Sequence, residues 1–104
     1  MRYAFSMQLK VGCKEKYLQR HQQIWPELTE LLKSYGIANY QIYLQPQSLQ
    51  LFASFEAPAD LDQEGLKQEH LMQKWWTSMA PYMLTKADSD EPQSSELSEM
   101  FFLN

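Results

Sequence analysis

A tyrosine and a histidine lie four residues apart in the stretch YLQRHQQIWPEL, as Tyr17 and His21. Positions i and i+4 of a helix share one face, so both side chains are expected to point roughly the same way as Leu28 and as either Ile24 or Trp25. Histidine has an ordinary pKa of about 6.5, which suits it to general acid–base catalysis near neutral pH. A buried polar pair that merely satisfies its own hydrogen bonds is the alternative, and spacing alone leaves both interpretations open.

Aromatic side chains are the second chemical feature, with 3 Trp, 6 Tyr and 5 Phe in the chain. Neighbouring residues of a helix are about 100° apart around its axis, so Trp75 and Trp76 are not expected to face the core together. One of them should line a cavity or its edge. Flat apolar rings cover the C–H face of a pyranose while a few polar groups bind its hydroxyls, so this combination is typical of a sugar pocket.

Signatures of several other active sites are missing from the sequence. It contains no GxSxG, GxxxxGK[ST], GxGxxG or HExxH motif, and its 3 glycines offer little backbone to cradle a phosphate. His21 and His70 lie on separate predicted helices without a cysteine or carboxylate at ligand spacing, so we expect no metal site. His70 is expected at the surface without a catalytic role. Cys13 has no histidine near it in sequence, which argues against a nucleophile.

Length and composition predict a single domain over residues 1–104. An apolar fraction of 44% allows a real core, although a domain this small gains burial by dimerising. The net charge of −4, without a basic stripe, argues against nucleic acid or an anionic membrane as partner. The sequence shows no apolar run of the roughly 18 residues that span a membrane, no signal-peptide core and no cysteine pair. A cytoplasmic protein is the expectation.

Alternating apolar and polar residues predict three strands, over 3–9, 37–44 and 49–56. A short polar turn joins the second and third strands, so these two should form a hairpin. Both faces of the third strand carry apolar side chains, with Leu51 opposite Phe52. We therefore expect helices on one face of the sheet and a second subunit on the other.

Helical periodicity fills the intervals between the strands. A first helix over 14–23 should break before Pro26, and a second segment over 26–35 should end at a left-handed Gly36. Residues 60–82 are predicted to form one helix with an apolar stripe. A polar connector over 85–95 then leads to the apolar run 100–103, expected to be a last strand or a segment packed on a partner. This order predicts the α+β class, with a ferredoxin-like βαββαβ antiparallel sheet and helices on one face.

Four motifs in this order resemble the L-rhamnose mutarotase family. They are HxxIWPEL from His21, NYxIYL from Asn39, QKWW from Gln73 and SSELxExFxL from Ser94. The resemblance covers nearly the whole chain and departs from the family pattern at residues 69–72, just before the tryptophans. It implies a homodimeric α/β barrel of two ferredoxin-like subunits packed sheet against sheet. It also implies an isomerase that interconverts the α and β anomers of L-rhamnose.

The resemblance further implies that His21 is the proton donor and that Tyr17, Tyr40, Trp75 and Trp76 contact the sugar. Opening a pyranose ring needs a proton at the ring oxygen and loss of one from the C1 hydroxyl, which general acid–base catalysis supplies without a cofactor. The base stays open among Tyr17, a bound water and another tyrosine. The apolar 6-methyl group suits a tryptophan, which predicts slower reaction of sugars with a 6-hydroxyl. A monooxygenase-like or haem-handling protein and a non-enzymatic sugar-binding dimer are the alternative functions.

Overall fold

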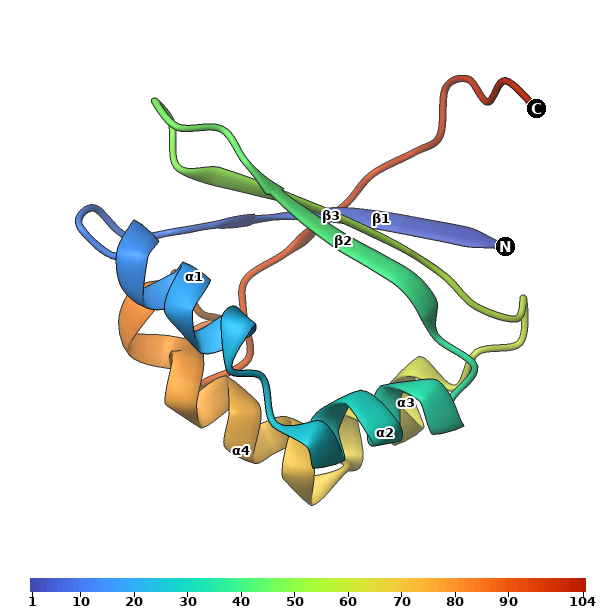
Figure 1. Ribbon diagram of the computed structural model, residues 1–104, viewed down its shortest axis with the longest axis horizontal. Coiled ribbons are helices and arrows are strands. Elements are labelled where there is room, and N and C mark those ends of the chain that lie inside the picture. The colour runs from blue at the N-terminus through green and yellow to red at the C-terminus, as the bar shows by residue number, and fades with distance from the viewer.

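The computed structural model describes all 104 residues and consists of an antiparallel sheet with helices on one face (Figure 1). The strands are β1 (Arg2–Gln8), β2 (Ala38–Leu44), β3 (Gln50–Glu56) and β4 (Ser95–Glu96), in the spatial order β2-β3-β1-β4. The helices are α1 (Lys14–Gln22), α2 (Pro26–Ser34), α3 (Gln63–Gln68) and α4 (His70–Met79), followed by the 3-10 helix η1 (Ala80–Tyr82). The predicted α+β, ferredoxin-like order is confirmed.

The central strand pair separates a buried face from an open one. Phe5 of β1 pairs with Ala53 of β3, and Met7 pairs with Leu51. Leu51 and Ala53 are almost fully buried under the helices. The intervening residues point the other way, so that Phe52 lies 37% exposed on the face without helices.

A β-bulge lies at the start of β2, next to Tyr40. Ala38 pairs with Glu56 but Gln41 pairs with Ser54, so β2 contains one extra residue in this interval. Asn39 takes up the irregularity with a φ of +52°, and its side-chain amide donates to the Glu56 carboxylate. Tyr40 lies on the helix side of the sheet with Ile42 and Leu44, because alternate residues of a strand share a face, and its ring stacks on Phe55.

The break between α1 and α2 is confirmed. Trp25 is extended, with a ψ of 128°, and Pro26 opens α2. Leu28, in the first turn of α2, is 1% exposed and anchors this helix in the core. The predicted left-handed Gly36 is also confirmed by its φ of +84°.

The single helix predicted over residues 60–82 is wrong, because the chain breaks at Glu69. This residue is extended, with a ψ of 127°, and separates α3 from α4. Its carboxylate accepts a hydrogen bond of 2.7 Å from the Tyr35 hydroxyl, which raises the pKa of Tyr35 to about 12. The Gln73 amide donates to the carbonyl of Lys67, 3.1 Å away, and satisfies a backbone acceptor at the end of α3. Long-range and local hydrogen bonds therefore stabilise the break.

Of the two alternatives expected for residues 100–103, the last strand is wrong, while packing on a partner stays a prediction. The last strand is the short β4, in which Glu96 pairs with Phe5 of β1. Leu97 extends this pairing by one hydrogen bond of 2.9 Å to the Ala4 carbonyl, after which the chain leaves the sheet (Figure 1). The apolar run 100–103 is exposed in the single chain.

The longest helix of the fold, α4, has 10 residues. No helix of the chain is long and apolar enough to cross a membrane.

Candidate active site

Helix α1 places Tyr17 and His21 in direct contact. Their ring centroids are 4.4 Å apart, and His21 Nδ1 lies 3.0 Å from the backbone oxygen of Tyr17. A carbonyl oxygen only accepts, so Nδ1 carries the hydrogen and donates it. In the neutral imidazole Nε2 then has its lone pair free, and no protein group hydrogen-bonds to it. His21 is half-buried, so this nitrogen is the one available for proton transfer.

Helix α4 brings Trp75 against the same imidazole. Trp75 is buried and meets His21 edge-on, with ring centroids 5.5 Å apart. Trp25, at the break between α1 and α2, also meets Trp75 edge-on, with ring centroids 5.1 Å apart. Tyr17, His21, Trp25 and Trp75 together are called the aromatic cluster below. It joins three elements, so its geometry depends on the packing of the helix layer.

Tyr40 approaches this cluster from the sheet. Its ring stacks on Phe55 with centroids 5.2 Å apart. The residue is 41% exposed, but its phenol end is enclosed, and this burial raises the pKa of Tyr40. Burial, and then the neighbouring Tyr40, raise the pKa of Tyr17. Both phenols therefore stay protonated near neutral pH and act as hydrogen-bond donors rather than bases.

The charge state of His21 follows from its surroundings. Burial lowers the pKa of the imidazole below its ordinary value of 6.5, and the hydrogen bond to the Tyr17 carbonyl opposes this effect only in part. His21 is therefore mainly neutral at pH 7. A neutral imidazole with a free Nε2 accepts a proton first and can donate it afterwards.

Trp76 packs against the same core but has no ring contact with the aromatic cluster. It is half-buried and lines a hollow of about 470 Å³ between α3, α4 and the loop 86–91. All nine other residues around this hollow are polar or charged. The expectation that only one of the two adjacent indoles is buried in the core is confirmed, with Trp75 buried and Trp76 at the hollow. The structure thus brings Tyr17, His21 and Trp75 together, with Tyr40 beside them, and places the ring of Trp76 elsewhere.

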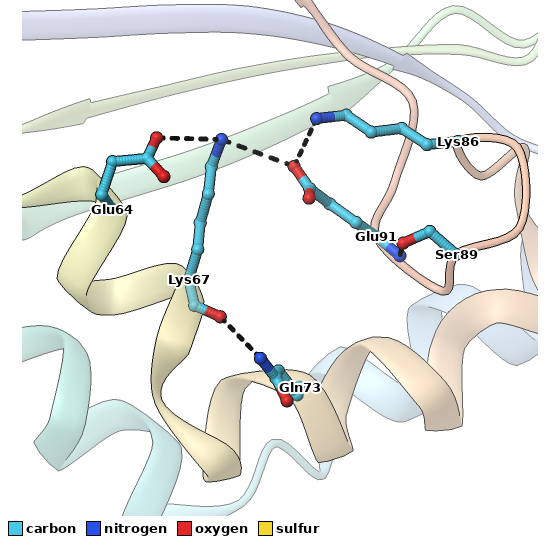
Figure 2. Close-up of polar contacts among 6 residues, drawn as sticks. All are labelled: Glu64, Lys67, Gln73, Lys86, Ser89 and Glu91. Carbon is cyan, nitrogen blue, oxygen red and sulfur yellow. Dashed lines mark hydrogen bonds and ion pairs between the residues drawn. The ribbon is translucent and has the colours of Figure 1, made fainter.

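An ion-pair network closes one side of this hollow (Figure 2). Glu91 lies 2.8 Å from the Lys86 ammonium and 3.5 Å from that of Lys67, which also pairs with Glu64 at 3.8 Å. Burial alone would raise the pKa of Glu91, but its interactions with the two lysines outweigh it and lower the pKa. These contacts attach the predicted polar connector over 85–95 to α3.

Arg20 also touches the aromatic cluster, and no sequence pattern singled it out. Its guanidinium carbon lies 5.8 Å from the ring centroid of Trp75. The available signal was its position next to His21, which by itself points to no role.

His70 lies exposed at the start of α4. No three His, Cys, Asp or Glu side chains come together as a metal site would require.

Comparisons with known proteins agree over the whole chain. A sequence model described as L-rhamnose mutarotase matches residues 2–103. The L-rhamnose mutarotase of Jannaschia sp. (strain CCS1) is 39% identical over 98% of this chain and 97% of its own length. That of Escherichia coli O1:K1 / APEC is 41% identical over 99% of this chain and 98% of its own length.

A solved structure shows the same similarity in three dimensions. The crystal structure of an L-rhamnose mutarotase from Formosa agariphila superposes with a TM-score of 0.90 at 36% sequence identity. The match covers 100% of this chain and 99% of the other. Sequence and fold agree along the full length, and the chain belongs to the L-rhamnose mutarotase family.

Proposed function

We propose that this chain is an isomerase that interconverts the α and β anomers of L-rhamnose, and that His21 moves the proton. Family membership supports the reaction and the substrate. The assignment of His21 rests on one observation, the hydrogen bond that holds Nδ1 on the Tyr17 carbonyl and leaves Nε2 free beside Trp75. The reaction needs proton transfer alone, so the proposal includes no cofactor.

The neutral imidazole suggests an order of steps. His21 Nε2 removes the proton of the C1 hydroxyl, whose O–H electrons form the carbonyl bond at C1. The bond between C1 and the ring oxygen breaks, its electron pair stays on the ring oxygen, and the imidazolium returns the proton there. Both oxygens are bonded to C1, so one imidazole can serve both. Rotation about C1–C2 and reversal of these steps give the other anomer, with no net gain or loss of protons.

The remaining proposed contacts hold the sugar. Tyr17 and Tyr40 present protonated phenols that can donate to sugar oxygens, and Trp75 offers an apolar surface beside His21. Trp76 remains a proposed contact from the family resemblance alone, because its ring lines the separate hollow. Phe substitutions at positions 75 and 76 separate the two: loss of affinity only at position 75 would remove Trp76 from the site.

The 6-methyl group of L-rhamnose provides a test of the apolar contact. L-mannose differs by a hydroxyl at this carbon, and burying that hydroxyl against an indole without a partner costs free energy. We expect L-mannose to exchange anomers more slowly than L-rhamnose at equal concentration. Equal rates would count against a tryptophan at the methyl group.

Saturation transfer by NMR between the two anomeric protons of L-rhamnose tests the reaction directly. Transfer that increases with added protein is the expected result, and its absence at stoichiometric protein would refute the activity. His21→Asn should lower the rate by roughly 10²–10⁴-fold, the usual contribution of general acid–base catalysis. His70→Asn is the matched control, because this exposed histidine should be dispensable. A sugar-binding protein without activity would bind L-rhamnose and leave the exchange rate unchanged.

A homodimer formed through the open face of the sheet is part of the proposal. Phe52 is 37% and Tyr43 63% exposed on this face, an unusual position for large aromatic residues in a small domain. Phe102, within the exposed apolar run 100–103, lies near residues of β1, β2 and β3, and the Arg2 guanidinium stacks on its ring at 3.6 Å. A second copy would cover both apolar surfaces.

Sedimentation analysis tests this interface. The wild type should sediment as a dimer and Phe52→Asp as a monomer, because a carboxylate at a desolvated interface is costly. A monomeric wild type would refute the dimer.

A cytoplasmic location is also part of the proposal, and the single free thiol of Cys13 supports it. Cell fractionation tests this location.

A further inference from the structure

Arg20 contains a buried polar atom that the fold does not satisfy. Its Nε is the one buried side-chain nitrogen or oxygen in the chain that has no hydrogen-bond partner. Leaving a buried donor unpaired costs roughly tenfold or more in the folding equilibrium. Native proteins rarely keep such a group unless a ligand or a functional state supplies its partner.

The position of Arg20 indicates where that partner comes from. Its guanidinium carbon lies 5.8 Å from the ring centroid of Trp75, and His21 contacts the same indole at 5.5 Å. The unpaired donor of Arg20 and the free Nε2 of His21 therefore lie around one tryptophan. In the proposed function the sugar binds beside His21, which makes a sugar oxygen the candidate for the missing partner of Arg20.

A purely structural role does not explain this arrangement. Arg20 lies in the last turn of α1, where a cation interacts favourably with the helix dipole. Lys33 likewise lies in the last turn of α2 and is exposed. The dipole needs only a charge near the helix end and gives no reason to bury Nε.

We infer that Arg20 is a sugar-binding residue whose Nε–H donates to an oxygen of the monosaccharide held beside His21. Arginine only donates, so its partner is an acceptor, either a hydroxyl or the ring oxygen of the sugar. The inference rests on the proposed function, because it places the sugar at the aromatic cluster. It adds a contact that holds the substrate in both anomeric forms.

Arg20→Lys is the decisive variant. Lysine keeps the positive charge and the three methylenes of the arginine stem, but it has a fourth methylene where arginine has Nε. We expect the KM for L-rhamnose to rise roughly 10- to 100-fold, the range for a hydrogen bond to a charged group. If the contact stabilises the bound sugar and the transition state equally, kcat of the variant should stay within about threefold of the wild-type value. Lys33→Gln is the matched control for the helix dipole and should leave both constants unchanged.

Thermal melting with and without L-rhamnose completes the test. Arg20→Lys should melt no lower than the wild type without sugar, because the unpaired donor is gone, and should gain less stability from the sugar. A KM within twofold of wild type, or a lower melting temperature with unchanged KM, would overturn the inference. These outcomes require a wild type that exchanges the anomers. A wild type that does not would instead refute the proposed function.

Discussion

The pH dependence of turnover tests the proposed role of His21 most directly. Burial lowers the pKa of the imidazole below 6.5, and its neutral form is the one with a free Nε2. If the neutral form starts the reaction, kcat/KM should rise with pH through this lowered pKa and then reach a plateau. The rate should already exceed about half of its plateau at pH 6.5, and about nine-tenths at pH 7.5.

No other group of the site is expected to titrate in the pH range in which kcat/KM rises. The phenols of Tyr17 and Tyr40 have pKa values raised above the ordinary value of 10, so they stay protonated across the assay range. Below the pKa of His21 the rate should fall about tenfold per pH unit, since one proton inactivates the base. Above pH 7.5 it should stay flat to about pH 9, well below the ordinary tyrosine pKa.

The assay is saturation transfer between the anomeric protons at fixed L-rhamnose, from pH 4.5 to 9, after subtraction of the exchange in buffer. His70→Asn should reproduce the wild-type profile, because His70 lies exposed on α4. A rate that increases as the pH falls below 7 would mean that the imidazolium starts the reaction. A midpoint above pH 6.5 would contradict the effect of burial. Either result would refute the reasoning.

Three further predictions concern stability. His21 binds a proton near its ordinary pKa of 6.5 in the unfolded chain but only at lower pH in the folded chain, so the free energy of unfolding should fall as the pH drops from 7.5 through 6.5 to the folded pKa. Urea titrations of the wild type and His21→Asn at several pH values measure this. If the free energy of unfolding changed equally with pH in both proteins, the prediction would be wrong. Gly36→Ala should destabilise the protein more than Gly12→Ala. Both positions have a positive φ, which costs an alanine roughly 1–3 kcal/mol of backbone strain, but only a Cβ at position 36 would clash with Pro58, at 2.7 Å. Equal melting temperatures of the two variants would exclude the clash. Glu91→Gln should speed hydrogen exchange of the loop 86–91, because Lys86 in the loop and Lys67 in α3 lose the carboxylate that both contact. Unchanged exchange would show that the loop is held by backbone contacts alone.

Local sequence signals predicted most of the fold because their causes are local. Period-two alternation placed β1, β2 and β3 to within one or two residues. A proline that blocks helical geometry in the preceding residue placed the break at Trp25. The left-handed Gly36 followed from its position after a helix. The helical spacing of Tyr17 and His21 likewise predicted that their rings meet.

The errors arose where distant residues decide the local structure. The pattern over residues 60–82 is helical throughout, yet Tyr35 hydrogen-bonds Glu69 across 34 positions and favours a break there. The apolar run 100–103 suggested a last strand, but the pairing with β1 is made by Ser95 and Glu96 instead. Apolar character alone does not distinguish a strand from a surface segment.

The sequence by itself determined the family, the order of elements and the histidine on one helical face, because these depend on residue types and short-range geometry. The tertiary structure decided which indole meets that histidine, since Trp75 and Trp76 differ only in the direction each takes from α4. It also decided the charge state of His21 and the unpaired Nε of Arg20. Both depend on burial, which arises only when separate elements pack together and exclude water.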